Sequence, residues 1–310
     1  MTHETEKPRF VRCSGELPLE AAEIMEGLLI LEGVEGAQTI TPEFLPPDEA
    51  PLPEGFARMV FFVPAEETTE SVGLFSVRDQ WNAFLQRNGL DVERCRLNVT
   101  PLESEDWATA WRRYFHPIKI GHALWVSPTW EKATPGPGEC TVELDPGMAF
   151  GTGGHETTSL VLAQIDAYCA DNPHSSMLDV GTGSGILSLA AAKLGIPRIV
   201  AIDNDPEAVA IAIENRTLNR IDEEQLAISA TPLTDIDGQF ELVCANIISS
   251  VLIAMREDLK AKTKKNGKIV LAGLLNHERD DVALSFNEIG LNLVEEASKG
   301  EWTLLAFEKK

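Results

Sequence analysis

The sequence predicts an α/β protein in which a mostly parallel, doubly wound, Rossmann-like sheet follows a small α+β module. From residue 175 onward, short apolar runs typical of buried strands alternate with stretches of helical periodicity, as in a parallel sheet covered by helices on both faces. The last two strand candidates, 291–297 and 302–308, are separated only by residues 298–301, which are too few for a crossover helix. The sheet is therefore expected to close with an antiparallel hairpin, so that its last strand is reversed.

Length and composition agree with a folded protein of two domains. The chain has 310 residues, of which 44% are apolar and 24% are charged, and these values exclude wholesale disorder and a fibrous protein. No apolar run reaches the roughly 18 residues that a membrane span needs, and the acidic first residues lead into no apolar core of a secretory signal. Five widely spaced cysteines, without a Cys-x-x-Cys pair, argue against disulfides and zinc. We therefore expect a cytoplasmic protein with no membrane contact and no metal site.

The chain is strongly acidic, because 26 Lys and Arg against 49 Asp and Glu give a formal net charge of −23. This balance argues against direct DNA binding, which needs cationic side chains to displace counterions from phosphates. It favours a basic partner through electrostatic steering. An acidic surface also keeps proteins soluble without any partner, so both interpretations stay open.

The pattern of apolar residues over 1–100 predicts a small module with the element order β-α-β-β-α-β. Its strands are expected at 10–13, 37–40, 57–63 and 91–99, and its helices at 17–31 and 68–88. This order is that of a split βαβ, or ferredoxin-like, module, which often serves as an interaction platform although the fold alone fixes no function. Trp107, Trp111 and Phe115 recur four residues apart, which predicts a helical linker over 101–117 before a second domain over 118–310.

A glycine-rich turn follows the first strand of the doubly wound sheet. The segment 179–185 reads Asp-Val-Gly-Thr-Gly-Ser-Gly and leads from an apolar strand into a helix, which makes Asp179, Gly181 and Gly183 candidate cofactor contacts. Glycines allow a tight turn and let a ligand approach the backbone closely. The spacing differs from the Gly-x-Gly-x-x-Gly of dinucleotide sites and suits a cofactor without phosphate, such as S-adenosylmethionine. A purely structural turn is the alternative.

Two polar side chains end later strands of the same sheet. Asp203 ends the second strand, 22 residues after Gly181, where a carboxylate can accept hydrogen bonds from both hydroxyls of a ribose. Asn246 ends the fourth strand, and its amide carbonyl can accept from an amine and aim the nitrogen lone pair at a methyl group. Asn246 is therefore the candidate catalytic residue, with capping of the following helix as the structural alternative. Asp205, before Pro206, is expected to be a helix cap.

A loop over 145–158 precedes the glycine turn and combines glycines with an apolar Met-Ala-Phe insert. Phe150 and Gly151 in this loop are candidates for closing over the cofactor and excluding water, and Thr158 stands where the next helix starts. His155 fits an ordinary loop histidine as well. No Ser-His-Asp arrangement or His-rich metal cluster competes with this interpretation.

Together these segments resemble the bacterial methyltransferases of large-subunit ribosomal protein eleven, which belong to the class I S-adenosylmethionine-dependent methyltransferases. The resemblance spans nearly the whole chain and is most specific in the 145–158 loop, the 179–185 turn and the Asn246-Ile247 pair. It implies that the cofactor contacts Thr158, Gly181, Asp203 and Asn246. The chain departs from the usual residues of that family at Gly154, Thr182 and Ser249, and none of these departures removes an obvious contact.

The resemblance implies a protein-lysine N-methyltransferase whose N-terminal module recognises the substrate. The enzyme would methylate lysine ε-amines and the N-terminal α-amine of the Lys-rich ribosomal protein, whose charge complements the acidic chain. A monomer is the default expectation. Three alternatives stay open: a methyltransferase of the same build acting on another protein lysine, a non-catalytic ribosome-binding factor, and an NAD-dependent oxidoreductase, against which the glycine spacing and the terminal hairpin argue.

Overall fold

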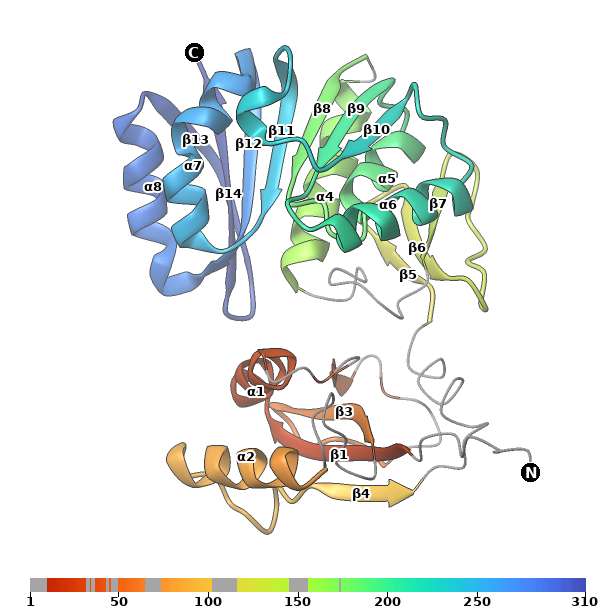
Figure 1. The fold of residues 1–310 in the computed structure, drawn as a ribbon, viewed down its shortest axis with the longest axis vertical. Coiled ribbons are helices and arrows are strands. Elements are labelled where there is room, and N and C mark those ends of the chain that lie inside the picture. Colours follow the sequence, from red (N-terminus) through yellow and green to blue (C-terminus); the bar gives the residue numbers. More distant parts are fainter. Residues whose placement is uncertain are drawn as a thin grey trace, which may run out of the picture. The chain divides into compact units, whose positions relative to one another are not determined.

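A computed structural model describes residues 10–31, 34, 37–42, 45, 50–64, 74–101, 116–144, 156–172 and 174–310. The chain divides into two compact units, Met1–His116 and Pro117–Lys310, each with its own sheets and helices (Figure 1). Residues 102–115 of the expected helical linker lie outside the described part of the chain, and so does most of the glycine-containing loop, over 145–155.

The N-terminal unit holds a four-stranded antiparallel sheet with the strand order β2-β3-β1-β4. Its elements are β1 (Phe10–Pro18), α1 (Leu19–Leu31), β2 (Gln38–Ile40), β3 (Phe56–Pro64), α2 (Leu74–Arg87) and β4 (Asn98–Pro101). The expected strand over 91–99 is wrong in its first half, because residues 92–95 form a turn. There the Asp91 carboxylate accepts hydrogen bonds from the backbone N–H groups of Glu93 and Arg94, at 3.0 and 3.2 Å.

One face of this sheet packs against the helices. Met59 and Phe61 of β3 are fully buried, as is Trp81 of α2, whose ring centroid lies 6.2 Å from that of Phe61. The Trp81 indole N–H donates a hydrogen bond to the Cys95 carbonyl at 2.8 Å, so the aromatic core also holds the turn before β4. Alternate strand positions face the other side of the sheet, because successive side chains of a strand point to opposite faces.

The second unit is built on a seven-stranded sheet with the order β10-β9-β8-β11-β12-β14-β13. Its strands are β8 (Ser176–Val180), β9 (Arg198–Ile202), β10 (Leu226–Ser229), β11 (Phe240–Asn246), β12 (Thr263–Leu275), β13 (Leu291–Lys299) and β14 (Trp302–Lys309). The pairs from β10 to β12 are parallel, whereas β14 is antiparallel to both β12 and β13. A separate three-stranded sheet contains β5 (Ile118–Ile120), β6 (Leu124–Pro128) and β7 (Cys140–Leu144).

Helices cover both faces of the seven-stranded sheet (Figure 1). They are α4 (Glu156–Asp171), α5 (Ile186–Lys193), α6 (Pro206–Leu218), α7 (Ser249–Lys262) and α8 (Arg279–Glu288). Met177 of β8 lies in a core with residues of α4 and α5, and the next residue, Leu178, lies in a second core with residues of α7 and α8. Burial on both faces explains why the parallel strands read as continuous apolar runs.

Candidate functional site

The glycine turn connects the carboxyl end of β8 to α5. Gly181 and Gly183 both have positive φ, 75° and 54°, which a residue with a side chain adopts only with strain. A Cβ on Gly181 would stand 2.5 Å from the Cγ2 atom of Ile247, so this position also has no room for a side chain. The turn therefore packs directly against the segment that follows β11.

Asp179 lies beneath this turn and is completely buried. Its Oδ2 atom accepts hydrogen bonds from the hydroxyls of Thr182 and Ser188, both at 2.7 Å, while Oδ1 has no partner among the described residues. Burial raises the pKa of Asp179 from 3.8 to about 6, and the two hydroxyls lower it in part. Asp179 thus ties the turn to the start of α5. These roles of Thr182 and Ser188 are not predictable from the sequence, because no spacing pattern marks a hydroxyl that supports a buried carboxylate.

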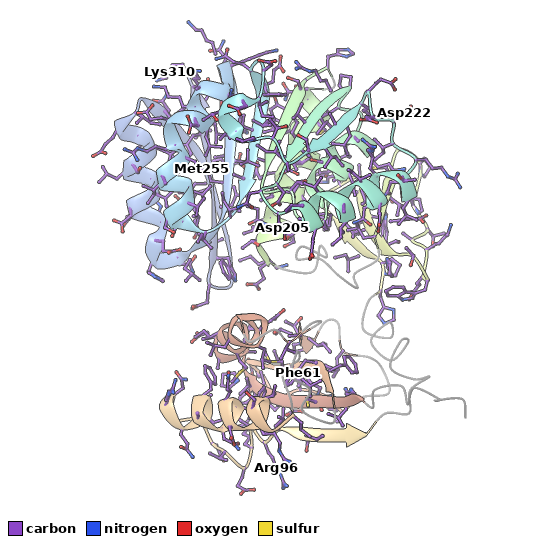
Figure 2. All side chains as sticks on the ribbon, viewed as in Figure 1. Phe61, Arg96, Asp205, Asp222, Met255 and Lys310 are labelled. Carbon is purple, nitrogen blue, oxygen red and sulfur yellow. The ribbon has the colours of Figure 1, made fainter. Side chains whose placement is uncertain are left out.

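Asp203 directly follows β9 and reaches back to the glycine turn. Its Oδ2 atom accepts a hydrogen bond from the Gly183 backbone N–H at 2.9 Å, and its Oδ1 atom accepts from the Asp205 N–H at 3.0 Å. Asp205 lies just before α6 (Figure 2). It caps this helix by accepting from the Glu207 N–H at 2.9 Å, with Pro206 in the first turn. A carboxylate offers about four lone-pair sites, so Asp203 keeps acceptor capacity for a ligand.

Asn246 is the last residue of β11 and pairs with Ala272 of β12. Its Nδ2 atom donates a hydrogen bond to the hydroxyl of Thr157 at 3.4 Å. The cap of the following helix is Ile248, not Asn246, so the structural alternative for Asn246 does not apply. Beyond it, Ile247 packs closely against Gly273 of β12, where a Cβ would stand 2.7 Å from the Ile247 carbonyl oxygen.

The first turn of α4 completes this edge of the sheet. Thr157 and Thr158 are both 1% exposed, and the Thr158 hydroxyl has no hydrogen-bond partner in the described part of the chain. Phe150 and Gly151, the other two predicted cofactor contacts, lie outside the described residues. The remaining predicted residues come together, because Gly183 contacts Asp203, Gly181 contacts the residue after Asn246, and Asn246 contacts the residue before Thr158.

The turn between β13 and β14 lies at the same edge. The backbone N–H of Asn276, just after β12, donates to the carbonyl of Glu301 at 2.8 Å, and the Asn276 side chain donates to the carbonyl of Gly300 at 3.0 Å. The Lys299 ammonium donates to the hydroxyl of Ser159 in α4 at 3.2 Å. The hairpin turn is therefore joined to the ends of β12 and α4 beside Asn246.

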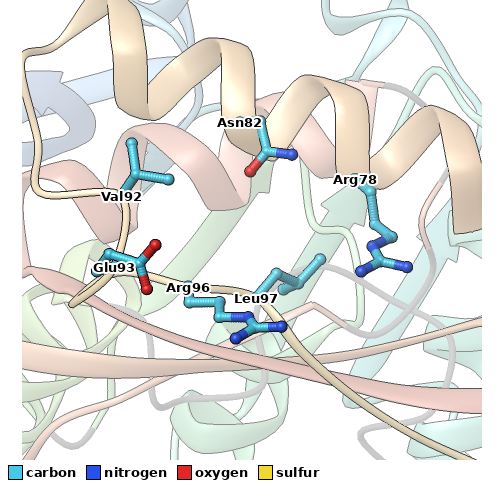
Figure 3. A pocket seen from close by; sticks show the side chains of 6 residues that line it. All are labelled: Arg78, Asn82, Val92, Glu93, Arg96 and Leu97. Carbon is cyan, nitrogen blue, oxygen red and sulfur yellow. The ribbon is translucent and has the colours of Figure 1, made fainter.

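The N-terminal unit carries two surface pockets. One, of about 160 Å³, is lined by Arg78, Asn82, Val92, Glu93, Arg96 and Leu97 (Figure 3). The other, of about 320 Å³, is lined by polar residues of β1, β3 and β4, including Arg12, Arg58 and Asn98. Across the described residues, no group of His, Cys, Asp and Glu is arranged to hold a metal ion. No described helix is both long and apolar enough to cross a membrane.

The order of the strands, the glycine turn after β8 and the polar residues at the ends of β9 and β11 are together those of a class I methyltransferase. A family model described as "Ribosomal protein L11 methyltransferase (PrmA)" matches residues 19–310. The chain therefore belongs to the ribosomal protein L11 methyltransferase family.

Relatives of this family resemble the chain over most of its length. The ribosomal protein L11 methyltransferase of Geobacter metallireducens is 42% identical over 264 residues, covering 84% of this chain and 83% of its own. That of Myxococcus xanthus is 37% identical over 300 residues, covering 97% of this chain and 99% of its own. The crystal structure of ribosomal protein L11 methylase from Lactobacillus delbrueckii subsp. bulgaricus superimposes with a TM-score of 0.58 at 32% identity, covering 63% of this chain and all of that one.

Proposed function

We propose that this chain transfers methyl groups from S-adenosylmethionine to lysine ε-amines and the N-terminal α-amine of ribosomal protein L11. The observation that carries the proposal is the meeting of Asp203, the glycine turn and Asn246 at the carboxyl ends of neighbouring strands. Ligands of doubly wound sheets bind at that edge. Membership of the ribosomal protein L11 methyltransferase family supports this substrate over another protein lysine and over a non-catalytic ribosome-binding role.

The residues at this edge fit S-adenosylmethionine. We propose that Asp203 accepts the ribose hydroxyls with its remaining lone pairs and that Gly181 and Gly183 allow the cofactor to approach the backbone. The Thr158 hydroxyl and Asp179 Oδ1 are buried polar atoms without a partner among the described residues, as expected where a polar ligand completes the hydrogen bonding. Phe150 and Gly151 are proposed to close over the cofactor from the preceding loop.

The bound cofactor would supply an electrophilic methyl group, and the chain's own residues would position the amine. In our proposal Asn246 Oδ1 accepts an N–H of the amine and so orients the nitrogen lone pair toward the methyl group that the cofactor would supply. The cofactor, held by Asp203 and the glycine turn, would give up its methyl group to the neutral amine and leave as the neutral thioether, and the resulting methylammonium would release its proton to water. Such positioning is worth roughly 7–11 kcal/mol.

The amine has to be neutral to attack, although a lysine has a reference pKa of about 10.4. Removal of water from the ammonium beside a sulfonium lowers the pKa of the amine, because burial and a like charge both disfavour the protonated form. A neutral amide such as Asn246 does not oppose this loss as a carboxylate would. We therefore propose that no strong dedicated base is needed.

We further propose that the N-terminal unit is a ferredoxin-like substrate-recognition domain over 1–100, and that 101–117 links it to the catalytic domain over 118–310. The antiparallel order β2-β3-β1-β4, the two helices and the two polar pockets support this interpretation. A net charge of −23 would attract a Lys-rich ribosomal protein and repel DNA. We propose that the protein acts as a cytoplasmic monomer.

The test is methyl transfer to purified ribosomal protein L11, followed by mass spectrometry of the intact protein and its peptides. We expect added methyl groups on lysines and on the N-terminal amine, and loss of most turnover in Asn246→Ala with unchanged S-adenosylmethionine affinity by calorimetry. Binding of the cofactor without any transfer would refute the catalytic proposal. Transfer to other ribosomal proteins but not to L11 would refute the substrate.

A further inference from the structure

The side chain of Asn246 is held by a residue from a distant part of the sequence. Asn246 Nδ2 donates a hydrogen bond to Thr157 Oγ1 at 3.4 Å, across 89 residues of chain. Thr157 is the second residue of α4 and is 1% exposed, so bulk water does not replace this contact easily. From the sequence alone, only the neighbouring Thr158 is predicted to contact the cofactor.

The backbone around Asn246 is already fixed by packing. Asn246 pairs with Ala272 within the sheet, and Ile247 is wedged between Gly181 and Gly273, each of which lacks room for even one methyl group. What packing leaves free is rotation of the Asn246 side chain, whose terminal torsion is broad in asparagine. Among the described residues, only the Thr157 hydroxyl forms a hydrogen bond with that side chain.

The orientation of the amide decides which atom meets a substrate. An asparagine amide carries two donors on nitrogen and an acceptor on oxygen, on opposite sides of a planar group. With Nδ2 turned to Thr157, Oδ1 has no hydrogen-bond partner in the described part of the chain and is available to accept. The reverse orientation would present an NH₂ donor to the N–H groups of an amine and would repel it.

We propose that Thr157 is a positioning residue whose hydroxyl holds the Asn246 amide so that Oδ1 faces the amine substrate. This inference rests on the proposed role of Asn246 in orienting the amine. Thr157 acts through Asn246, and the cofactor-binding residues Asp203 and Gly181 make their contacts without it. Loss of the hydroxyl should therefore lower kcat while leaving cofactor affinity intact.

The test compares Thr157→Val, which keeps the shape but loses the hydroxyl, with Thr157→Ser, which keeps the hydroxyl. We expect Thr157→Val to lower kcat about tenfold, the effect of one lost hydrogen bond on a transition state. Thr157→Ser should stay within about twofold of the wild type. Thr157→Ala also lacks the hydroxyl and should lower kcat by about the same factor, so it replaces Thr157→Val if valine disturbs the fold. Thr217→Val is the control, since it makes the same substitution at an exposed threonine of α6 whose hydroxyl donates to the Ile213 carbonyl and not to Asn246.

A double-mutant cycle separates positioning from a general structural effect. In the Asn246→Ala background, Thr157→Val should cause no further loss of kcat, because the side chain that it positions is gone. Additive losses in the double variant, normal kcat in Thr157→Val, or a loss of S-adenosylmethionine affinity by calorimetry would each overturn the inference. If Asn246→Ala alone retained normal kcat, the proposed role of Asn246 itself would fail, an outcome distinct from failure of Thr157 alone.

Discussion

The carboxylate of Asp203 accepts a hydrogen bond from the backbone N–H of Gly183, with 2.9 Å between Oδ2 and nitrogen. This contact joins the end of β9 to the glycine turn after β8, two segments that are 20 residues apart in the chain. The side chain proposed to hold the ribose therefore also fixes the turn beside which the ribose would lie. Changes at Asp203 should act on both.

We expect Asp203→Asn to weaken S-adenosylmethionine binding by about 10- to 100-fold. The amide keeps the shape of the carboxylate but loses its charge, and its NH₂ group would face the backbone N–H groups or the ribose hydroxyls. Because hydrogen bonds to a charged group are worth about 1.5–3 kcal/mol, their loss corresponds to this change in affinity. Isothermal titration calorimetry measures the effect. Asp205→Asn is the matched control, because asparagine caps a helix as well as aspartate does, so affinity should not change. Equal losses in the two variants would contradict the assignment.

The second prediction concerns the pH dependence of stability. Burial raises the pKa of Asp179 from 3.8 to about 6, so between these pH values the folded protein keeps a proton that the unfolded chain releases. The contribution of Asp179 to stability is therefore fully present below about pH 4 and is lost as the pH rises toward about 6, by at most about 1.4 kcal/mol per pH unit. Above about pH 6 the contribution of Asp179 to stability should not change further.

Asp179→Asn removes this titration, so the unfolding free energy of the variant relative to the wild type should rise from pH 4 to 6. Urea denaturation at a series of pH values measures the difference. Thr217→Val serves as control, since it changes an exposed, uncharged side chain of α6 and leaves every titratable group in place. A constant difference between Asp179→Asn and the wild type would show that Asp179 does not titrate in this range.

The third prediction separates backbone strain from a steric clash at Gly273. Gly273 and Gly138 have nearly equal positive φ, 80° and 83°, but a Cβ on Gly273 would meet the Ile247 carbonyl oxygen whereas none lies near Gly138. Gly138→Ala should cost about 1–2 kcal/mol of stability and leave kcat normal. Gly273→Ala should cost about 1–3 kcal/mol more and lower kcat, because Ile247 follows Asn246. Equal stability and equal kcat in the two variants would contradict this packing argument.

The fourth prediction tests recognition by the N-terminal unit. Arg78 and Arg96 line one pocket, and neither forms an ion pair within the described residues (Figure 3). Their N–H groups suit backbone carbonyls or single carboxylates, which a Lys-rich protein substrate also carries. The double variant Arg78→Ala, Arg96→Ala should raise KM for ribosomal protein L11 about 5- to 30-fold without changing cofactor affinity. Arg87→Ala, on the same helix outside the pocket, should have little effect. An unchanged KM in the double variant would exclude this pocket from recognition.

Rules about parallel sheets made much of the site predictable from sequence. Asp203 and Asn246 each close an apolar run, and the carboxyl ends of parallel strands share an edge, so their approach to the glycine turn could be expected. The hydrogen bond from Ser188 to Asp179 could not be predicted, because Ser188 lies within an apolar helix and its role depends on how α5 packs on β8. The contact between Thr157 and Asn246 likewise depends on tertiary packing of α4 against the sheet.

The order of the last strands and the turn at Asp91 also could not be predicted from the sequence alone. The short gap before residue 302 predicts a hairpin, but its length does not reveal which of the two strands pairs with β12. The apolar pattern places Asp91 in a strand, whereas its side chain accepts hydrogen bonds from the backbone two and three residues ahead and so favours a turn. Periodicity gives the element type, whereas packing and side-chain hydrogen bonds decide its limits.

The position of β14 between β12 and β13 has a consequence for the order of assembly. β13 sits at the outer edge of the sheet, and its only strand partner among the described residues is β14, so its place in the sheet depends on the strand that follows it in the chain. The two strands therefore add to the growing sheet as one hairpin, and the turn bearing Lys299 and Gly300 reaches Ser159 and Asn276 in that same event. The contacts that this turn makes near Asn246 would therefore form together, when the hairpin docks on β12.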